Sequence, residues 1–130
     1  MSITSNFRQI QRELPDSVTI VLAAKTRTPQ EVAEAIEAGA THIGENFVQE
    51  AERVQAALGD RARRVSWHMI GPLQKNKINR AMQLFQVIQT VDSVEKAIAI
   101  DKRARRQGTV IPVYMEINSA DEAAKSGFSP

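Results

Sequence analysis

Short apolar, β-branched runs alternate along the chain with longer segments that have helical periodicity. The apolar runs cover residues Val18–Ala24, Thr41–Gly44, Val65–Ile70, Leu84–Thr90 and Val110–Asn118. Short runs of this composition are typical of buried strands. Their starts recur roughly every 20–26 residues, which is the length of one compact strand–helix unit. The pattern therefore predicts five strands, each separated from the next by a helix.

The segments between the runs carry helix start and stop signals. The first is opened by Thr28 as N-cap and Pro29 in the first turn, and Gly39 closes it. A glycine also closes the second and fourth segments. Helices are expected before the first apolar run and over Thr28–Gly39, Phe47–Gly59, Gln74–Gln83 and Val94–Gly108, with Asp92 or Ser93 as the cap of the last.

Alternating strands and helices predict a parallel sheet covered by helices. A doubly wound sheet and a (β/α)₈ barrel both fit this order. No G-x-G-x-x-G follows the first strand, which weakens the nucleotide-binding doubly wound version. We therefore predict a TIM-type (β/α) barrel. Such a barrel needs eight units and about 250 residues, so we expect residues 1–130 to be the first five units of one barrel domain.

Composition narrows the function classes. The chain is 42% hydrophobic and 25% charged, as in ordinary globular proteins, and no apolar run approaches the roughly 20 residues that span a bilayer. Net charge is only +2, which does not indicate a nucleic acid or an anionic membrane as partner. There is no cysteine, and no His/Asp/Glu set has metal-ligand spacing. We expect a cytoplasmic, monomeric protein without a metal.

Polar residues follow each predicted strand, where the functional groups of parallel α/β folds gather. Lys25 is the most suggestive of them, because it follows the first apolar run directly. A lysine that starts in the barrel wall is partly desolvated, and its neutral amine can form an imine with an aldehyde. The alternative is a lysine that ends a strand and reaches water.

Three further residues have two interpretations each. Asn46 could face a ligand or serve as the N-cap of the second helix. His68 lies inside a strand, where a lone histidine is more often a satisfied core residue than a ligand. Gly71 enters a loop and permits close backbone approach. His42 begins the second strand, so we expect it at the far end of the barrel.

Several motifs resemble those of the pyridoxal phosphate homeostasis protein family, formerly called proline-synthetase co-transcribed homologues. The matching stretches are Leu22–Thr26 (LAAKT), Gly44–Glu50 (GENFVQE), Trp67–Lys77 (WHMIGPLQKNK), Thr90–Ser93, Ile117–Asn118 and Lys125–Phe128. Their order and spacing match over essentially the whole chain. One departure is Ala124, where the family often has serine before the lysine of the fifth-strand loop.

The resemblance implies a barrel like the N-terminal domain of alanine racemases, without the second domain of those enzymes. It implies pyridoxal 5'-phosphate (PLP) as a Schiff base on Lys25, with Asn46 near the cofactor and phosphate-binding residues on later strands. His68 and Gly71 complete the expected cofactor-binding set. It further implies a role in vitamin B6 and amino-acid homeostasis without known turnover, with PLP-dependent apo-enzymes as candidate recipients.

Two rival classes are a PLP-dependent amino-acid racemase and an aldolase-type barrel that uses a lysine without PLP. Racemisation needs acid–base groups on both faces of the substrate α-carbon. In the racemases one of these is a tyrosine from the second domain, whereas the single tyrosine here, Tyr114, lies within the fifth predicted strand. The family motifs argue against the aldolase. We therefore expect a carrier of PLP and no catalytic residues.

Overall fold

A computed structural model describes residues 2–120, 122–123 and 125–130 of the chain. In chain order the elements are α1 (Ile3–Glu13), β1 (Leu22–Ala23), α2 (Pro29–Glu37), β2 (His42–Glu45), α3 (Val48–Leu58), a 3₁₀ helix (Gly59–Arg64), β3 (Ser66–Met69), a 3₁₀ turn (Lys75–Lys77), α4 (Ile78–Leu84), β4 (Val87–Val91), α5 (Val94–Gln107) and β5 (Val113–Met115). Helix α1 lies beside α2, where the Thr4 hydroxyl donates to Glu34.

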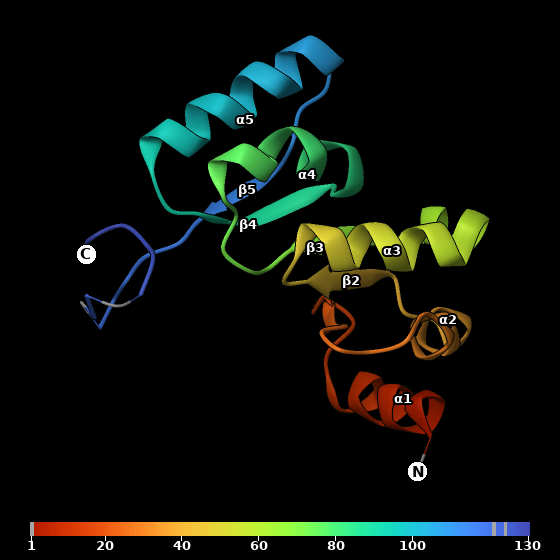
Figure 1. The fold of residues 1–130 in the computed structure, drawn as a ribbon. Coiled ribbons are helices and arrows are strands. Elements are labelled where there is room, and N and C mark those ends of the chain that lie inside the picture. Colours follow the sequence, from red (N-terminus) through yellow and green to blue (C-terminus); the bar gives the residue numbers. More distant parts are fainter. Residues whose placement is uncertain (1, 121, 124) are drawn as a thin grey trace.

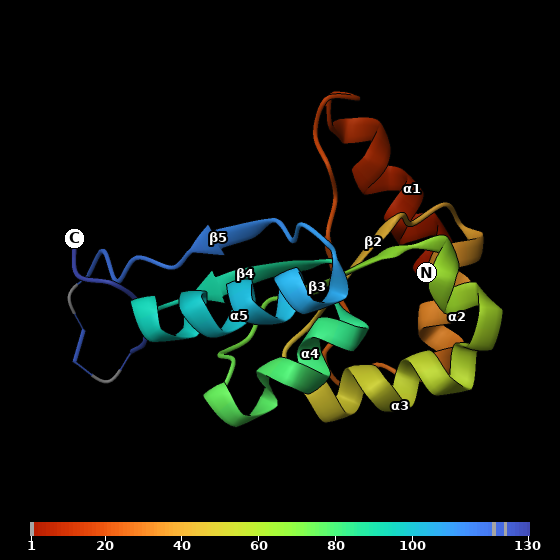
Figure 2. The ribbon, with the colours of Figure 1, turned by 90° about the horizontal axis from the view of Figure 1, so that it is seen from above.

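The five strands form one parallel sheet in sequential order, β1-β2-β3-β4-β5. A doubly wound sheet reverses its strand order at a switch point, whereas a (β/α) barrel adds each strand beside the last. Helices α3, α4 and α5 lie along the same face of this sheet (Figures 1 and 2). The described residues thus confirm the barrel-type fold predicted from the sequence.

Local signals place the helix ends. At α2 the Thr28 hydroxyl accepts from the Glu31 amide at 3.1 Å, and the Glu31 carboxylate accepts from the Thr28 amide at 3.0 Å. This reciprocal capping box satisfies two amides that a helix leaves without partners. Ser93 caps α5, and Gly108 ends it in the left-handed conformation with φ +67°. These termini agree with the prediction.

Some predicted boundaries are wrong. Strand β1 pairs with β2 only through Leu22 and Ala23, so the apolar run that begins at Val18 is mostly extended loop. Strand β5 is likewise shorter than predicted, and Val110 is 95% exposed. Apolar β-branched residues predict a strand only where a neighbouring strand supplies hydrogen bonds, and that depends on tertiary structure.

The start of α3 also differs from the prediction. Phe47, not Asn46, occupies the N-cap position, and no side chain caps this helix. The helix predicted over Gln74–Gln83 begins as a 3₁₀ turn and becomes α-helical only at Ile78. Asn46 is therefore free of the capping role that its residue type suggested.

The core lies between the sheet and the helices. Ile43, Trp67, Met69 and Ile88 are at most 2% exposed on the helix-facing side of the sheet. Side chains alternate between the two faces of a strand, so His42, Gly44 and His68 face the opposite, inner side. No helix in the described part of the chain combines the length and apolar character needed to cross a bilayer.

Candidate functional site

Strand register places the predicted site residues at one edge of the sheet. Ala23, Gly44 and His68 lie side by side on neighbouring strands. Two residues further along each strand, at the carboxyl edge, come Lys25 and Asn46. The structure thus brings Lys25 and Asn46 to the same edge and places His68 on the inner face below them.

Lys25 occupies the centre of a tight turn. The Arg27 amide donates to the Ala24 carbonyl at 3.0 Å, which closes the turn around Lys25 and Thr26. Thr26 has a φ of +65°, and its amide donates to the Glu50 carboxylate of α3 at 2.9 Å. The Lys25 side chain is exposed. The expected partial desolvation of Lys25 is not seen among the described residues, because β1 ends at Ala23 and Lys25 lies in the exposed turn that follows it.

Asn46 and Gly71 meet at the same edge. A Cβ atom on Gly71 would lie 2.3 Å from the Asn46 carbonyl oxygen and 2.7 Å from the Asn46 Cα. The Gly71 carbonyl accepts a hydrogen bond from the Thr90 hydroxyl at 2.8 Å. A larger residue than glycine at position 71 would overlap the Asn46 backbone, so Gly71 allows the loops after β2 and β3 to pack together.

A recess of about 310 Å³ adjoins these loops. Its lining comes from the loops after β2 and β3, and comprises Asn46, Phe47, Val48, Gln49, Met69, Pro72, Leu73, Gln74 and Lys77. Phe47 is 56% exposed although it is large and apolar. The sequence pattern placed Phe47 inside the helix predicted over Phe47–Gly59. In the structure it stands before the helix, as an exposed aromatic ring at the recess.

His68 is buried and hydrogen-bonded on both sides. Its Nε2 lies 2.9 Å from His42 Nδ1, and its Nδ1 lies 3.0 Å from Gln89 Nε2. Burial, and then the neighbouring His42, lowers the pKa of His68. When the Gln89 amide donates to Nδ1, the proton of a neutral His68 is on Nε2 and faces His42. His68 is a satisfied residue of the inner wall.

His42 begins β2 and lines the cleft at the amino end of the strands, as expected, but it also contacts His68. Although it begins β2, its ring reaches His68 on the neighbouring strand, with ring centroids 5.1 Å apart. The side chains of residues on adjacent strands two positions apart in register are diagonal neighbours. The position of His42 along β2 therefore did not indicate that its side chain would contact His68 on the neighbouring strand.

Glu45 is the least expected group at this edge. Its side chain is 0% exposed, and neither carboxylate oxygen has a hydrogen-bond partner among the described residues. Burial, and then the Glu50 carboxylate, raises the pKa of Glu45 to about 7, against the opposing effect of Arg53. The sequence analysis assigned Glu45 no role beyond its place in the motif Gly44–Glu50.

Polar residues after β4 and β5 serve their own loops. Asp92 pairs with Lys96 one turn along α5, at 3.0 Å. The Asn118 amide donates to the Glu122 carbonyl at 2.7 Å. Ala124 lies outside the described residues. No group of three or more histidine, aspartate or glutamate side chains in the described ranges could hold a metal ion.

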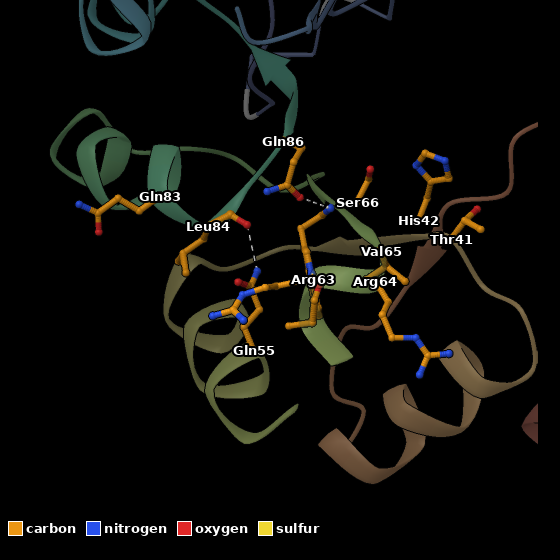
Figure 3. Close-up of a pocket in the computed structure, with 12 residues that line it drawn as sticks. Thr41, His42, Gln55, Arg63, Arg64, Val65, Ser66, Gln83, Leu84 and Gln86 are labelled. Carbon is orange, nitrogen blue, oxygen red and sulfur yellow. Dashed lines mark hydrogen bonds between the residues drawn. The ribbon is translucent and has the colours of Figure 1, made fainter. Parts of the chain in front are cut away.

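A second cleft, of about 680 Å³, opens at the opposite, amino end of β2 and β3. Figure 3 shows Gln55 bonded to the Leu84 carbonyl, at 3.0 Å, and Gln86 accepting from the β3 backbone. Arg64 points away toward α2, where it pairs with Glu37 at 2.7 Å. In barrels of this kind the amino end serves stability rather than chemistry. The candidate site is thus the carboxyl edge that holds Lys25.

Comparison with known proteins agrees with this placement. The family described as alanine racemase, N-terminal domain, matches residues 1–130. The chain is 32% identical over 140 residues to the pyridoxal phosphate homeostasis protein of Pasteurella multocida. That alignment covers 100% of this chain and 60% of the relative, so the chain spans about 60% of its length. The resemblance inferred from the motifs is confirmed.

Solved structures give the same fold. PipY of Synechococcus elongatus, solved without PLP, superimposes with a TM-score of 0.93 at 32% identity, over 99% of this chain and 60% of that chain. PipY with PLP bound gives a TM-score of 0.88, also at 32% identity, over 99% and 59%. Alanine racemase of Clostridium difficile shares the fold, with a TM-score of 0.80 at 16% identity over 99% of this chain and 33% of the enzyme.

Proposed function

Because the chain belongs to the family described as alanine racemase, N-terminal domain, we propose that it binds PLP as a Schiff base on Lys25. The proposed role is vitamin B6 homeostasis without catalytic turnover. The observation that carries the proposal is the position of Lys25 at the carboxyl edge of the sheet, two residues beyond Ala23 as Asn46 is two residues beyond its partner Gly44. A primary amine at this edge can attack the aldehyde of a cofactor bound there and form an imine with it reversibly.

The neighbouring residues fit a flat, polar cofactor. PLP, when bound, supplies an aldehyde and an electron-accepting ring. Asn46 would offer its amide, and the exposed Phe47 ring would supply an apolar surface. The His68 nitrogens are already bonded to His42 and Gln89, so His68 would contribute its ring to the floor of the site. Gly71 would act by pressing the Asn46 loop into position.

Absence of turnover is part of the proposal. Tyr114 is the single tyrosine of the chain, and it is 57% exposed on β5 rather than at the carboxyl edge. The P. multocida relative and PipY carry no enzyme name, whereas the alanine racemase resemblance is at 16% identity and shows only the fold. We further propose that the protein is a monomer and that it passes PLP to PLP-dependent apo-enzymes.

Borohydride trapping tests the Schiff base. The protein incubated with PLP is expected to absorb in the visible, to lose that absorbance on reduction, and to carry the label on Lys25 in peptide mass mapping. Lys25→Ala should abolish absorbance and label while the circular dichroism spectrum is retained, and Lys102→Ala on α5 is the matched control. Label on Lys75, Lys77 or Lys125 with none on Lys25 would exclude this assignment.

A further inference from the structure

We propose that Glu50 is a positioning residue for Lys25, because its carboxylate locks the turn that presents the lysine. The inference rests on the proposed function of Lys25. The contact joins two distant parts of the sequence: Glu50 lies in the first turn of α3, and its Oε1 accepts from the Thr26 amide at 2.9 Å.

The turn has the geometry of type II. In that turn the second central residue has positive φ and the first does not. Thr26 has φ +65° and is the one non-glycine residue with positive φ among those the structure describes, so Lys25 has the ordinary negative value. Glycine or asparagine is favoured at the position of Thr26. A β-branched residue there is strained and needs compensation from its surroundings.

Glu50 offsets the strain at Thr26 by accepting a hydrogen bond from the Thr26 amide. Types I and II differ by a flip of the peptide between the two central residues. The N–H of that peptide belongs to Thr26, and it is this N–H that Glu50 accepts. The bond to the Ala24 carbonyl closes the turn but comes from the Arg27 amide, outside the flipping peptide. Glu50 is therefore the contact that opposes the flip.

Helix α3 is a firm support for this contact. Its Val48, Ala51 and Val54 are at most 4% exposed, so the helix is anchored in the core. A flip would change the ψ angle of Lys25 and the orientation of the peptide that follows it, and the rotamers open to a side chain depend on these backbone angles. A reacting group misplaced by about 1 Å can lose up to a hundredfold in rate. The expected consequence of losing Glu50 is slow and weak imine formation in a protein that remains folded.

The simpler alternative is that Glu50 only stabilises α3, since a negative charge is favourable in the first turn of a helix. Two substitutions separate the roles. Glu50→Gln removes the charge but keeps an oxygen that can accept from Thr26. Thr26→Gly relieves the strain, so the turn no longer depends on the acceptor. If Glu50 acted only through the helix dipole, Glu50→Gln would lose the effect as Glu50→Ala does, and Thr26→Gly would not restore the rate.

The experiment measures the rate constant of imine formation with PLP by visible absorbance, with circular dichroism as a folding check. Glu50→Ala should slow the reaction about tenfold or more, Glu50→Gln should stay within about threefold of wild type, and Thr26→Gly should restore most of the rate to Glu50→Ala. Glu52→Ala is the matched control, because Glu52 lies on the same helix but pairs with Arg80.

The inference is overturned if Glu50→Ala reacts at the wild-type rate, or if Thr26→Gly does not restore a slowed rate. If Glu50→Ala does not fold, Glu50→Gln and the Glu50→Gln/Thr26→Gly double variant test the inference instead. The proposed lock is contradicted if Glu50→Gln slows imine formation and Thr26→Gly does not restore the rate. A wild-type protein that forms no imine on Lys25 would instead remove the proposed function, and this inference with it.

Discussion

Replacing the buried Glu45 should change how the stability of the protein depends on pH. The carboxyl is fully buried, its oxygens lack partners among the described residues, and its pKa is raised from 4.5 to about 7. Between these values the folded state holds a proton that the unfolded state has released. The free energy of unfolding therefore falls as pH rises from about 4.5 to about 7, and the penalty is complete above pH 7.

The size of this penalty follows from the difference between the two pKa values. A pKa difference of one unit corresponds to about 1.4 kcal/mol, so the raised pKa of Glu45 predicts a total of about 3 kcal/mol at alkaline pH. Most of it, roughly 2–3 kcal/mol, falls between pH 5 and pH 8. Since folded domains are stable by only about 5–15 kcal/mol, a loss of this size is measurable.

Urea unfolding of the wild-type protein and of Glu45→Gln at pH 5 and pH 8 measures this pH-dependent loss of stability. The difference in unfolding free energy between the two proteins should change by roughly 2–3 kcal/mol across this range, in favour of the variant at pH 8. His68 has a lowered pKa and contributes in the opposite direction below pH 6.5, but it does so in both proteins and cancels.

Glu52→Gln is the control, because its exposed carboxylate has a lowered pKa and loses its contribution only below pH 4.5. If the wild-type and Glu45→Gln stabilities run parallel from pH 5 to pH 8, the unfavourable burial of an ionised Glu45 is refuted.

Three further predictions concern packing, capping and chemistry. Gly71→Ala should lower the free energy of unfolding by roughly 1–3 kcal/mol, because its Cβ would lie 2.3 Å from the Asn46 carbonyl oxygen; an unchanged urea midpoint would show that the two loops can separate. Thr28→Ala removes the cap of α2 and should cost about 1 kcal/mol in thermal unfolding, with Thr109→Ala, which caps no helix start, as comparison. The PLP-loaded protein should not exchange the α-proton of alanine or serine into deuterated water above the rate of free PLP, and turnover near about 1 per second or faster would contradict the carrier function.

Local interactions explain why much of the fold was predictable. The cap of α2 is complete within Thr28, Pro29 and Glu31, and the glycine that ends α5 needs only its own backbone conformation. Such signals act over three or four residues, so the sequence displays them directly. The placement of Lys25 and Asn46 at one edge of the sheet was predicted in the same way, from their positions just after apolar runs.

Contacts between distant residues explain what was missed. The His42–His68 bond and the Glu50–Thr26 bond join residues 26 and 24 positions apart, and neither pair has any relation visible along the chain. The exposure of Lys25 depends on where β1 stops pairing with β2. These features exist only after parallel strands set the register of their neighbours.

The sequence by itself determined the strand–helix order, the helix caps and the edge of the sheet at which Lys25 and Asn46 would meet. Periodicity and capping are properties of adjacent residues, and parallel strands necessarily bring their carboxyl ends together. Only the tertiary structure decided that Glu45 is buried without a partner, that Gly71 presses on Asn46, and that Glu50 holds the turn of Lys25. Burial and hydrogen bonding at those atoms depend on which residues of other elements fill the space around them, and one-dimensional spacing carries no record of that.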